Sequence, residues 1–351
     1  MTTTNEEVNK GGLLARTTKM QSFWIFVVLV VIIAFFTLMA PGKFATYNNV
    51  TNIVQNVSIW AVIAVGMTYI IITAGIDLSV GSLLVFSSVM SAKVMESMGG
   101  EGWTTALVGL LVALVSGVAW GLFNGFVIAK AKVPPLIVTL GSLSLALGAA
   151  QIMTGGLDIR SAPVVLQDVI GYGRFLGIPA ISLISLAVVV IGGVWLHKTR
   201  FGRYTYAVGS NEIAARRVGI NVDRHLILVY ALGGLLCGLA GILSLSQYGT
   251  TTIAGQSMTN LNVITAVVIG GTSIFGGQGS MLGTMIGLFI PAVLQSGFVI
   301  IGVSPYWQTA AVGAILIAAV YVDQQRRSQV LRGGKPRTKG KQPTTKHPAT
   351  T

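Results

Sequence analysis

Ten apolar segments, separated by polar or Gly/Pro-containing breaks, follow one another along the chain. They lie at residues 22–40, 56–74, 79–97, 104–129, 136–154, 179–196, 226–248, 262–274, 281–301 and 307–322. Most are long enough to cross the hydrocarbon core of a bilayer as a helix, which takes about 20 apolar residues. The segment 262–274 is short, so we expect a broken or re-entrant helix there, surrounded by protein or a polar cavity. The pattern predicts an all-α integral membrane protein with about ten transmembrane helices.

The lysines and arginines are distributed unequally between the two sides of these segments. If the N-terminus is inside, ten crossings leave 19 of the 23 basic residues on the cytoplasmic side and 4 outside. Such an excess is typical of cytoplasmic loops. We therefore expect both termini in the cytoplasm, with 1–21 as an N-terminal tail, 22–325 as the transmembrane domain and 326–351 as a basic, disordered tail.

The composition agrees with a lipid environment. Of the 351 residues 53% are hydrophobic and only 9% are charged, whereas a soluble domain carries about 25% charged residues. The net charge is +13, but the basic residues lie in short gaps and in the C-terminal tail. This placement is typical of the cytoplasmic side of a multi-pass membrane protein and not of a nucleic-acid-binding surface. The basic tail either lies on anionic membrane lipid or is solvated.

Motifs for catalysis or metal binding are missing from the sequence. It contains no H-E-x-x-H, no phosphate-binding G-x-x-x-x-G-K-[ST] and no G-x-S-x-G, and its single cysteine, Cys237, lies in an apolar segment. We therefore expect no catalytic residue, no metal site and no cofactor bound by this chain, which excludes an ATPase or a metalloenzyme.

Asp77 is the acidic residue placed between two segments that both lie deep in the expected membrane. It stands in "TAGIDLSVGS" (73–82), where Gly75 and Gly81 allow a tight break. A carboxylate at this depth is a functional candidate, but it also suits the cap of a helix that begins near Leu78. Both roles stay open.

Polar side chains inside the apolar segments are candidates for a translocation path. Hydroxyl and amide groups can hydrogen-bond a neutral, hydroxylated solute, and their alternative role is hydrogen bonding between helices. The candidates are Thr73, Asp77, Asn124, Thr139, Asn262 and Gln295.

Two glycine-rich stretches share their placement of Gly and Thr. They are "AVGMTYIIITAGIDLSVGS" (64–82) and "VIGGTSIFGGQGSMLGT" (268–284). In the expected topology both cross from outside to inside and turn back. The similarity indicates either a parallel duplication, as in some transporters, or ordinary glycine-rich membrane sequence. We expect structural roles for Gly75, Gly81, Gly270, Gly271, Gly276 and Gly277.

The longest cytoplasmic loop, 197–225, encodes a short capped helix. In "GSNEIAARRVGI" (209–220), Asn211 suits the N-cap and Glu212 the first turn. Arg216 and Arg217 fall in the last turn, and Gly219 fits a left-handed stop. Two turns of helix are marginal in water, so this helix needs a partner surface.

Four blocks in order resemble the permease subunits of bacterial ABC importers for monosaccharides, of the ribose, galactose, xylose and arabinose type. The blocks are "GIDLSVGS" (75–82), "GLFNGFVIAKAKVPPLIVTLGSLS" (121–144), "FGRYTYAVGSNEIAARRVGI" (201–220) and "ITAVVIGGTSIFGGQGSMLGT" (264–284). The resemblance covers roughly residues 50 to 325, and the ordered set is highly specific. Where many members carry an acidic pair before the last block, this chain has Asn260 and Asn262, which leaves the exact sugar open.

The resemblance implies a coupling helix, a set of partners and a mechanism. The coupling residues that it implies are Asn211, Glu212, Ala214, Ala215, Arg216, Arg217 and Gly219. They would dock on a separate ATPase subunit, which holds ATP and Mg²⁺. A soluble sugar-binding protein would deliver the solute from outside, two permease copies would pair as a homodimer, and transport would proceed by alternating access.

Three alternatives remain. A secondary transporter driven by an ion gradient would need several ionisable groups in the membrane, and an intramembrane enzyme would need a reactive pair; the sequence supplies neither. The third is an ABC permease for another solute, such as a nucleoside or an autoinducer-type sugar. Acidic residues expected outside, where a binding protein would dock, are Glu96, Glu101, Asp158 and Asp168.

Overall fold

The structure, a computed structural model, describes residues 21–333 except 255 and 257, and consists almost entirely of helices. The elements in chain order are α2 (Gln21–Met39), α3 (Tyr47–Ile72), α4 (Val80–Met98), α5 (Trp103–Ala129), α6 (Pro135–Thr154), α7 (Val164–Leu166), the π-helix η1 (Gln167–Gly171), β1 (Arg174–Phe175), β2 (Ile178–Pro179), α8 (Ala180–Lys198), α9 (Arg200–Ser210), α10 (Glu212–Arg217), α11 (Val222–Tyr248), α12 (Thr259–Ile269), α13 (Met281–Ile300) and α14 (Pro305–Gly333).

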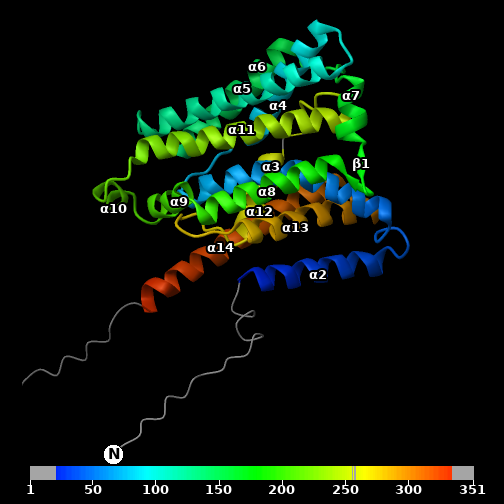
Figure 1. The fold of residues 1–351 in the computed structure, drawn as a ribbon. Coiled ribbons are helices and arrows are strands. Elements are labelled where there is room, and N and C mark those ends of the chain that lie inside the picture. The colour runs from blue at the N-terminus through cyan, green and yellow to red at the C-terminus, as the bar shows by residue number, and fades with distance from the viewer. Residues whose placement is uncertain (1–20, 255, 257, 334–351) are drawn as a thin grey trace, which may run out of the picture.

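The long helices lie side by side in one bundle (Figure 1). Among the described residues, seven helices are long and apolar enough to cross a membrane: α3, α5, α6, α8, α11, α13 and α14. Helices also occupy the other three expected segments, as α2, α4 and α12, but these do not meet the same criteria. Seven spans are therefore supported by length and composition, and the remaining three crossings stay predictions.

The short segment 262–274 contains a helix that is too short to cross the membrane by itself. Its helix, α12, has 11 residues, which corresponds to about 16 Å, roughly half of a bilayer core. The chain then turns between Gly270 and Ser280 before α13 begins.

The ends of the bundle differ (Figure 1). Helices α9 and α10 lie at one end, which we call the α10 end, and α7 and β1 lie at the other. Helix α2 begins, and helix α14 finishes, at the α10 end. The basic tail was expected to be disordered from residue 326, but α14 continues to Gly333. The Gln, Arg and Leu residues in this part of the chain are good helix formers. The rest of both expected tails lies outside the described residues.

The centre of the bundle is formed by α3 and α11, whose side chains are largely buried. Helix α11 contacts α5 through glycines: a Cβ on Gly117 would overlap the backbone of Gly234, and one on Gly121 would overlap that of Tyr230. Small residues let membrane helices approach closely and gain van der Waals contact. The abundance of glycine, 44 residues, is thus used for packing.

The two stretches that resemble each other in sequence also correspond in space. Each comprises the end of one helix, a turn and the start of the next, from α3 to α4 and from α12 to α13. The turns touch each other, since the backbone N–H of Gly277 donates to the carbonyl of Ile72 at 2.8 Å. In addition, the hydroxyls of Thr68 and Thr284 lie 3.0 Å apart. The α3–α4 turn and the α12–α13 turn therefore contact each other near the α10 end.

Candidate coupling loop and translocation path

The short helix α10 has the local geometry that its sequence predicts. The side chain of Asn211 accepts a hydrogen bond from the backbone N–H of Ala214 at 2.9 Å, which caps the helix. Arg216 and Arg217 lie in the last turn, and Gly219 stops the helix with a φ of +87°. Ala215 is the buried residue of the helix.

Two large apolar side chains, one in α10 and one directly after it, are exposed. Ile213 and Val218 expose 67% and 77% of their surface. Beside them lie the charged side chains of Glu212 and Arg217, both exposed. A short helix that displays apolar groups flanked by charge is suited to docking on another protein.

An ion cluster fixes α10 against the bundle. The guanidinium of Arg216 binds Glu212 at 2.8 Å and also contacts Asp223, at the start of α11. Asp223 binds Lys132 at 2.9 Å and Lys130 at 3.5 Å, and both lysines follow α5. The hydrogen bonds to Asp223 and Glu212 raise the pKa of Arg216. The cluster therefore joins α10 to the α5–α6 connection and to α11.

Helix α9 was not expected from the sequence. Thr199 caps it by accepting from the N–H of Gly202 at 3.3 Å, and Gly202, Thr205 and Val208 form its buried face. The signal was present in the spacing of Phe201, Thr205 and Val208, but the many charges of the loop concealed it.

The end of α9 packs closely against the α3–α4 turn and the α12–α13 turn. A Cβ on Gly209 would overlap the carbonyl oxygen of Ile72, and would lie 2.7 Å from the N–H nitrogen of Gly277. The hydroxyl of Tyr206 donates to the carbonyl of Gly279 at 2.8 Å. We call the contact of Gly209, Ile72 and Gly277 the glycine junction; it connects the last turn of α9, which leads into α10, to the end of α3 and to the turn after α12.

Asp77 belongs to a buried network of hydrogen bonds. Its carboxylate accepts from the backbone N–H of Ser79 at 2.8 Å and from the Ser79 hydroxyl. The Asn124 amide donates to the Ser79 hydroxyl at 3.1 Å, and Ser142 donates to the Asn124 carbonyl oxygen. These four residues, which we call the inner network, join the α3–α4 connection to α5 and α6. Helix α4 begins at Val80, two residues later than expected, so Asp77 orders the approach to the helix and does not occupy its N-cap position.

The other path candidates divide into groups. Thr139 donates to the carbonyl of Pro135 at 2.9 Å and to that of Ile76 at 3.2 Å, beside the inner network. Thr73 donates to Ile70, within the end of its own helix, at 2.7 Å. Asn262 and Gln295 lie elsewhere, where α12 and α13 face each other.

The expected structural glycines act in two ways. A Cβ on Gly75, Gly81 or Gly270 would come closer than 3.0 Å to a neighbouring atom, so these three permit close packing. Gly271, Gly276 and Gly277 have positive φ angles and form the turn. At the α3–α4 turn the positive φ belongs to Ala74, at +62°, and not to Gly75.

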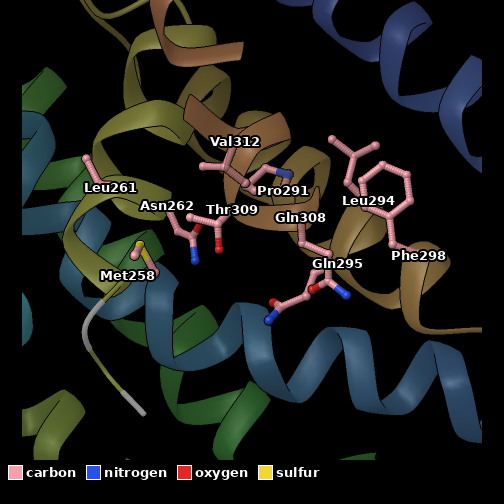
Figure 2. A pocket seen from close by; sticks show the side chains of 10 residues that line it. All are labelled: Met258, Leu261, Asn262, Pro291, Leu294, Gln295, Phe298, Gln308, Thr309 and Val312. Atoms are coloured by element: carbon pink, nitrogen blue, oxygen red, sulfur yellow. The ribbon is translucent and has the colours of Figure 1, made fainter. Parts of the chain in front are cut away.

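Asn262 and Gln295 belong to a group of three adjoining hollows at the end of the bundle opposite α10. Gln295 borders all three, whereas Asn262 and Asn56 each border two. Figure 2 shows one of them, in which the polar ends of Asn262, Gln295 and Gln308 point toward one side of the hollow. The further amide residues of the lining are Asn49, Asn52 and Gln256. We call the combined space the amide chamber.

The asparagines that α3 contributes to the chamber were missed by the sequence reading, unlike Asn262. Asn49, Asn52 and Asn56 lie one turn apart on α3, a spacing that places them on one face of a helix. Because these turns are polar, the apolar segment was read as starting at residue 56, although α3 starts at Tyr47. The pattern of asparagines was the signal that could have identified this face.

Two of the four acidic residues expected outside have structural contacts. Glu101 accepts from the backbone N–H of Val164 at 2.6 Å, and Asp158 accepts from that of Ile253 at 2.9 Å. All four residues are exposed, but Glu96 and Asp168 have no such contact among the described residues. The latter pair is therefore better placed than the former to meet a partner.

Comparisons with known proteins agree on one family. The family described as "Branched-chain amino acid transport system / permease component" matches residues 49–320. The ribose import permease protein of Escherichia coli (strain K12) is 39% identical, over 86% of this chain and 93% of the relative. The fructose import permease protein of Rhizobium meliloti is 35% identical over 85% and 84%. The xylose transport system permease protein of Escherichia coli (strain K12) is 31% identical over 88% and 93%. No solved structure gives a match.

Proposed function

Since the chain belongs to the permease component family of branched-chain amino acid transport systems, and its relatives are named import permeases for ribose, fructose and xylose, we propose that it is the membrane-spanning subunit of a bacterial ABC importer. Its cargo is a monosaccharide or a similar small polyhydroxylated solute, moved inward. The seven apolar helices fit a multi-pass protein of the inner membrane.

The observation that carries the coupling role is the capped helix α10 and its two connections to the bundle. Its exposed Ile213 and Val218 offer a surface to an ATPase subunit, which would hold ATP and Mg²⁺. The ion cluster connects α10 to α5 and α11, and the glycine junction connects it to α3 and α12. Movement of α10 by the ATPase would therefore displace the helices that carry the inner network and the helices that line the amide chamber.

The remaining partners follow from the orientation. If the α10 end is cytoplasmic, as its basic loops favour, then α2 begins and α14 finishes in the cytoplasm and the chain crosses ten times. The opposite end then faces a soluble sugar-binding protein, with Glu96 and Asp168 available for steering. We propose pairing of two copies as a homodimer in membrane lipid, which gives the complex two coupling helices.

ATP-driven sugar uptake by reconstituted vesicles tests this function. The purified chain, with the ATPase and binding protein of its host, should take up ribose, fructose or xylose only when ATP is supplied to the cytoplasmic side. Dissipating proton and sodium gradients with ionophores should leave the rate unchanged. Uptake without the ATPase, abolished by the ionophores, would identify a secondary transporter instead.

A further inference from the structure

The amides of the chamber fall into two groups. Asn49 accepts from Ser296 of α13, Asn56 accepts from Gln247 and Tyr248 of α11, and Gln256 donates to Ser244 of α11, so these amides join elements of the bundle. Asn262, Gln295 and Gln308 differ from them and from the inner network. In the inner network, both ends of the Asn124 amide are used in bonds to other helices, which is the usual role of polar groups between membrane helices. Among the described residues, no hydrogen bond uses the side-chain amide of Asn262, Gln295 or Gln308, and the Gln308 nitrogen is buried without a partner. These amides do not connect helices, so their hydrogen-bonding groups are available to something that enters the chamber.

The lining has the composition of a site for a neutral hydroxylated molecule. Each amide offers two donors and an acceptor with two lone pairs, and a sugar hydroxyl both donates and accepts. None of the described residues that line the three hollows is charged, so an ionic solute would lose its hydration without gaining a counter-charge. Trp60 and Tyr248 supply aromatic walls, as is common in small-molecule sites.

The chamber also has the room and the position for such a molecule. Two of its hollows have volumes of about 270 and 150 Å³, and a single water needs roughly 10–15 Å³ of such space. Its residues come from the start of α3, the end of α11, the start of α12, the second half of α13 and the start of α14. All these helix ends lie away from the α10 end (Figure 1).

We propose that the amide chamber is a binding site for a neutral, polyhydroxylated sugar that has entered from the outer face, with Asn262 and Gln295 as its hydrogen-bonding residues. This inference rests on the import function proposed above and assigns the place in the chain where the solute is held. The groups of the inner network, in contrast, are already paired with one another.

Substitutions of similar size test the site. Asn262→Leu and Gln295→Met remove the hydrogen-bonding groups, and Asn48→Leu makes the same change at an exposed position of α3 outside the lining. In vesicles with ATPase and binding protein, uptake of labelled ribose, fructose and xylose serves as the probe. Each chamber variant should lower uptake about tenfold, since a lost hydrogen bond to a solute is worth about that factor, while hydrolysis of ATP continues and Asn48→Leu keeps the parental rate.

The outcomes separate this inference from the function on which it rests. Parental uptake in both chamber variants would overturn the site and leave the importer function standing. Absence of ATP-dependent uptake by the parent chain would overturn the function, and the site with it.

A labelling measurement covers the case in which these variants do not assemble. Asn262→Cys and Gln295→Cys are treated on intact cells with a membrane-impermeant, charged thiol reagent. The native Cys237 is buried and serves as the silent background. Modification of both introduced thiols is expected, because the chamber opens to the outer face. No modification of either would overturn the proposal.

Discussion

At the scale of single residues, Asp77 shows how a carboxylate is accommodated deep in the bundle. It is 2% exposed, and its partners include both the backbone and the hydroxyl of Ser79. Because Ser79 in turn accepts from Asn124, the carboxylate organises a connection between three parts of the fold. This arrangement supports a structural role for Asp77 at the α3–α4 break, and it sits beside Thr139, which the sequence had grouped with it.

Replacing Asp77 by alanine is expected to destabilise the protein. The backbone N–H of Ser79 would lose its acceptor in a buried place, which costs about 1–3 kcal/mol. Thermal unfolding of the purified chain in detergent measures this, with Asp77→Asn as the matched control, because its side-chain oxygen can still accept. An alanine variant as stable as the parent would show that the bonds to Ser79 do not hold the break together.

At the scale of elements, local signals were readable and contacts between segments were not. The caps at Asn211 and Gly219 predict α10 because each acts within a few residues. In contrast, nothing in the sequence indicates that Asn124 and Ser79 are in contact. They are far apart along the chain, and only the packing of the helices brings them together. The polar start of α3 and the whole of α9 were missed because hydropathy marks apolar segments and these turns are polar.

The glycine junction gives a prediction at this scale. Gly209→Ala places a methyl group where the Ile72 carbonyl and Gly277 lie, so we expect a loss of about 1–3 kcal/mol from overpacking. Gly141→Ala, in α6 with open space around it, should instead gain about 0.5–1 kcal/mol, as alanine normally does in a helix. Unfolding temperatures of the two variants are the measurement. Equal shifts in unfolding temperature would mean that α9 does not pack closely against the α3–α4 and α12–α13 turns.

At the scale of the whole molecule, the orientation assigns each site to a side of the membrane. The hairpin residue Leu176 is 89% exposed at one end and Val218 is 77% exposed at the other. With an impermeant thiol reagent on intact cells, Leu176→Cys should react. Val218→Cys, which the ATPase would cover, should react only in opened membranes from which the ATPase has been stripped. The reverse pattern would show that α10 lies outside the cell, where it could not contact a cytoplasmic ATPase.

The most direct test of the account is co-purification of the tagged chain from its host in mild detergent. We expect an ATPase chain in fixed proportion, with ATP hydrolysis in the purified sample. Both should be lost when Glu212–Arg217 is replaced by a Gly/Ser segment of equal length, while the amount of chain in the membrane stays the same. A parent chain free of partners in several mild detergents, or an ATPase retained after the replacement, would contradict the claim that α10 couples this permease to ATP hydrolysis.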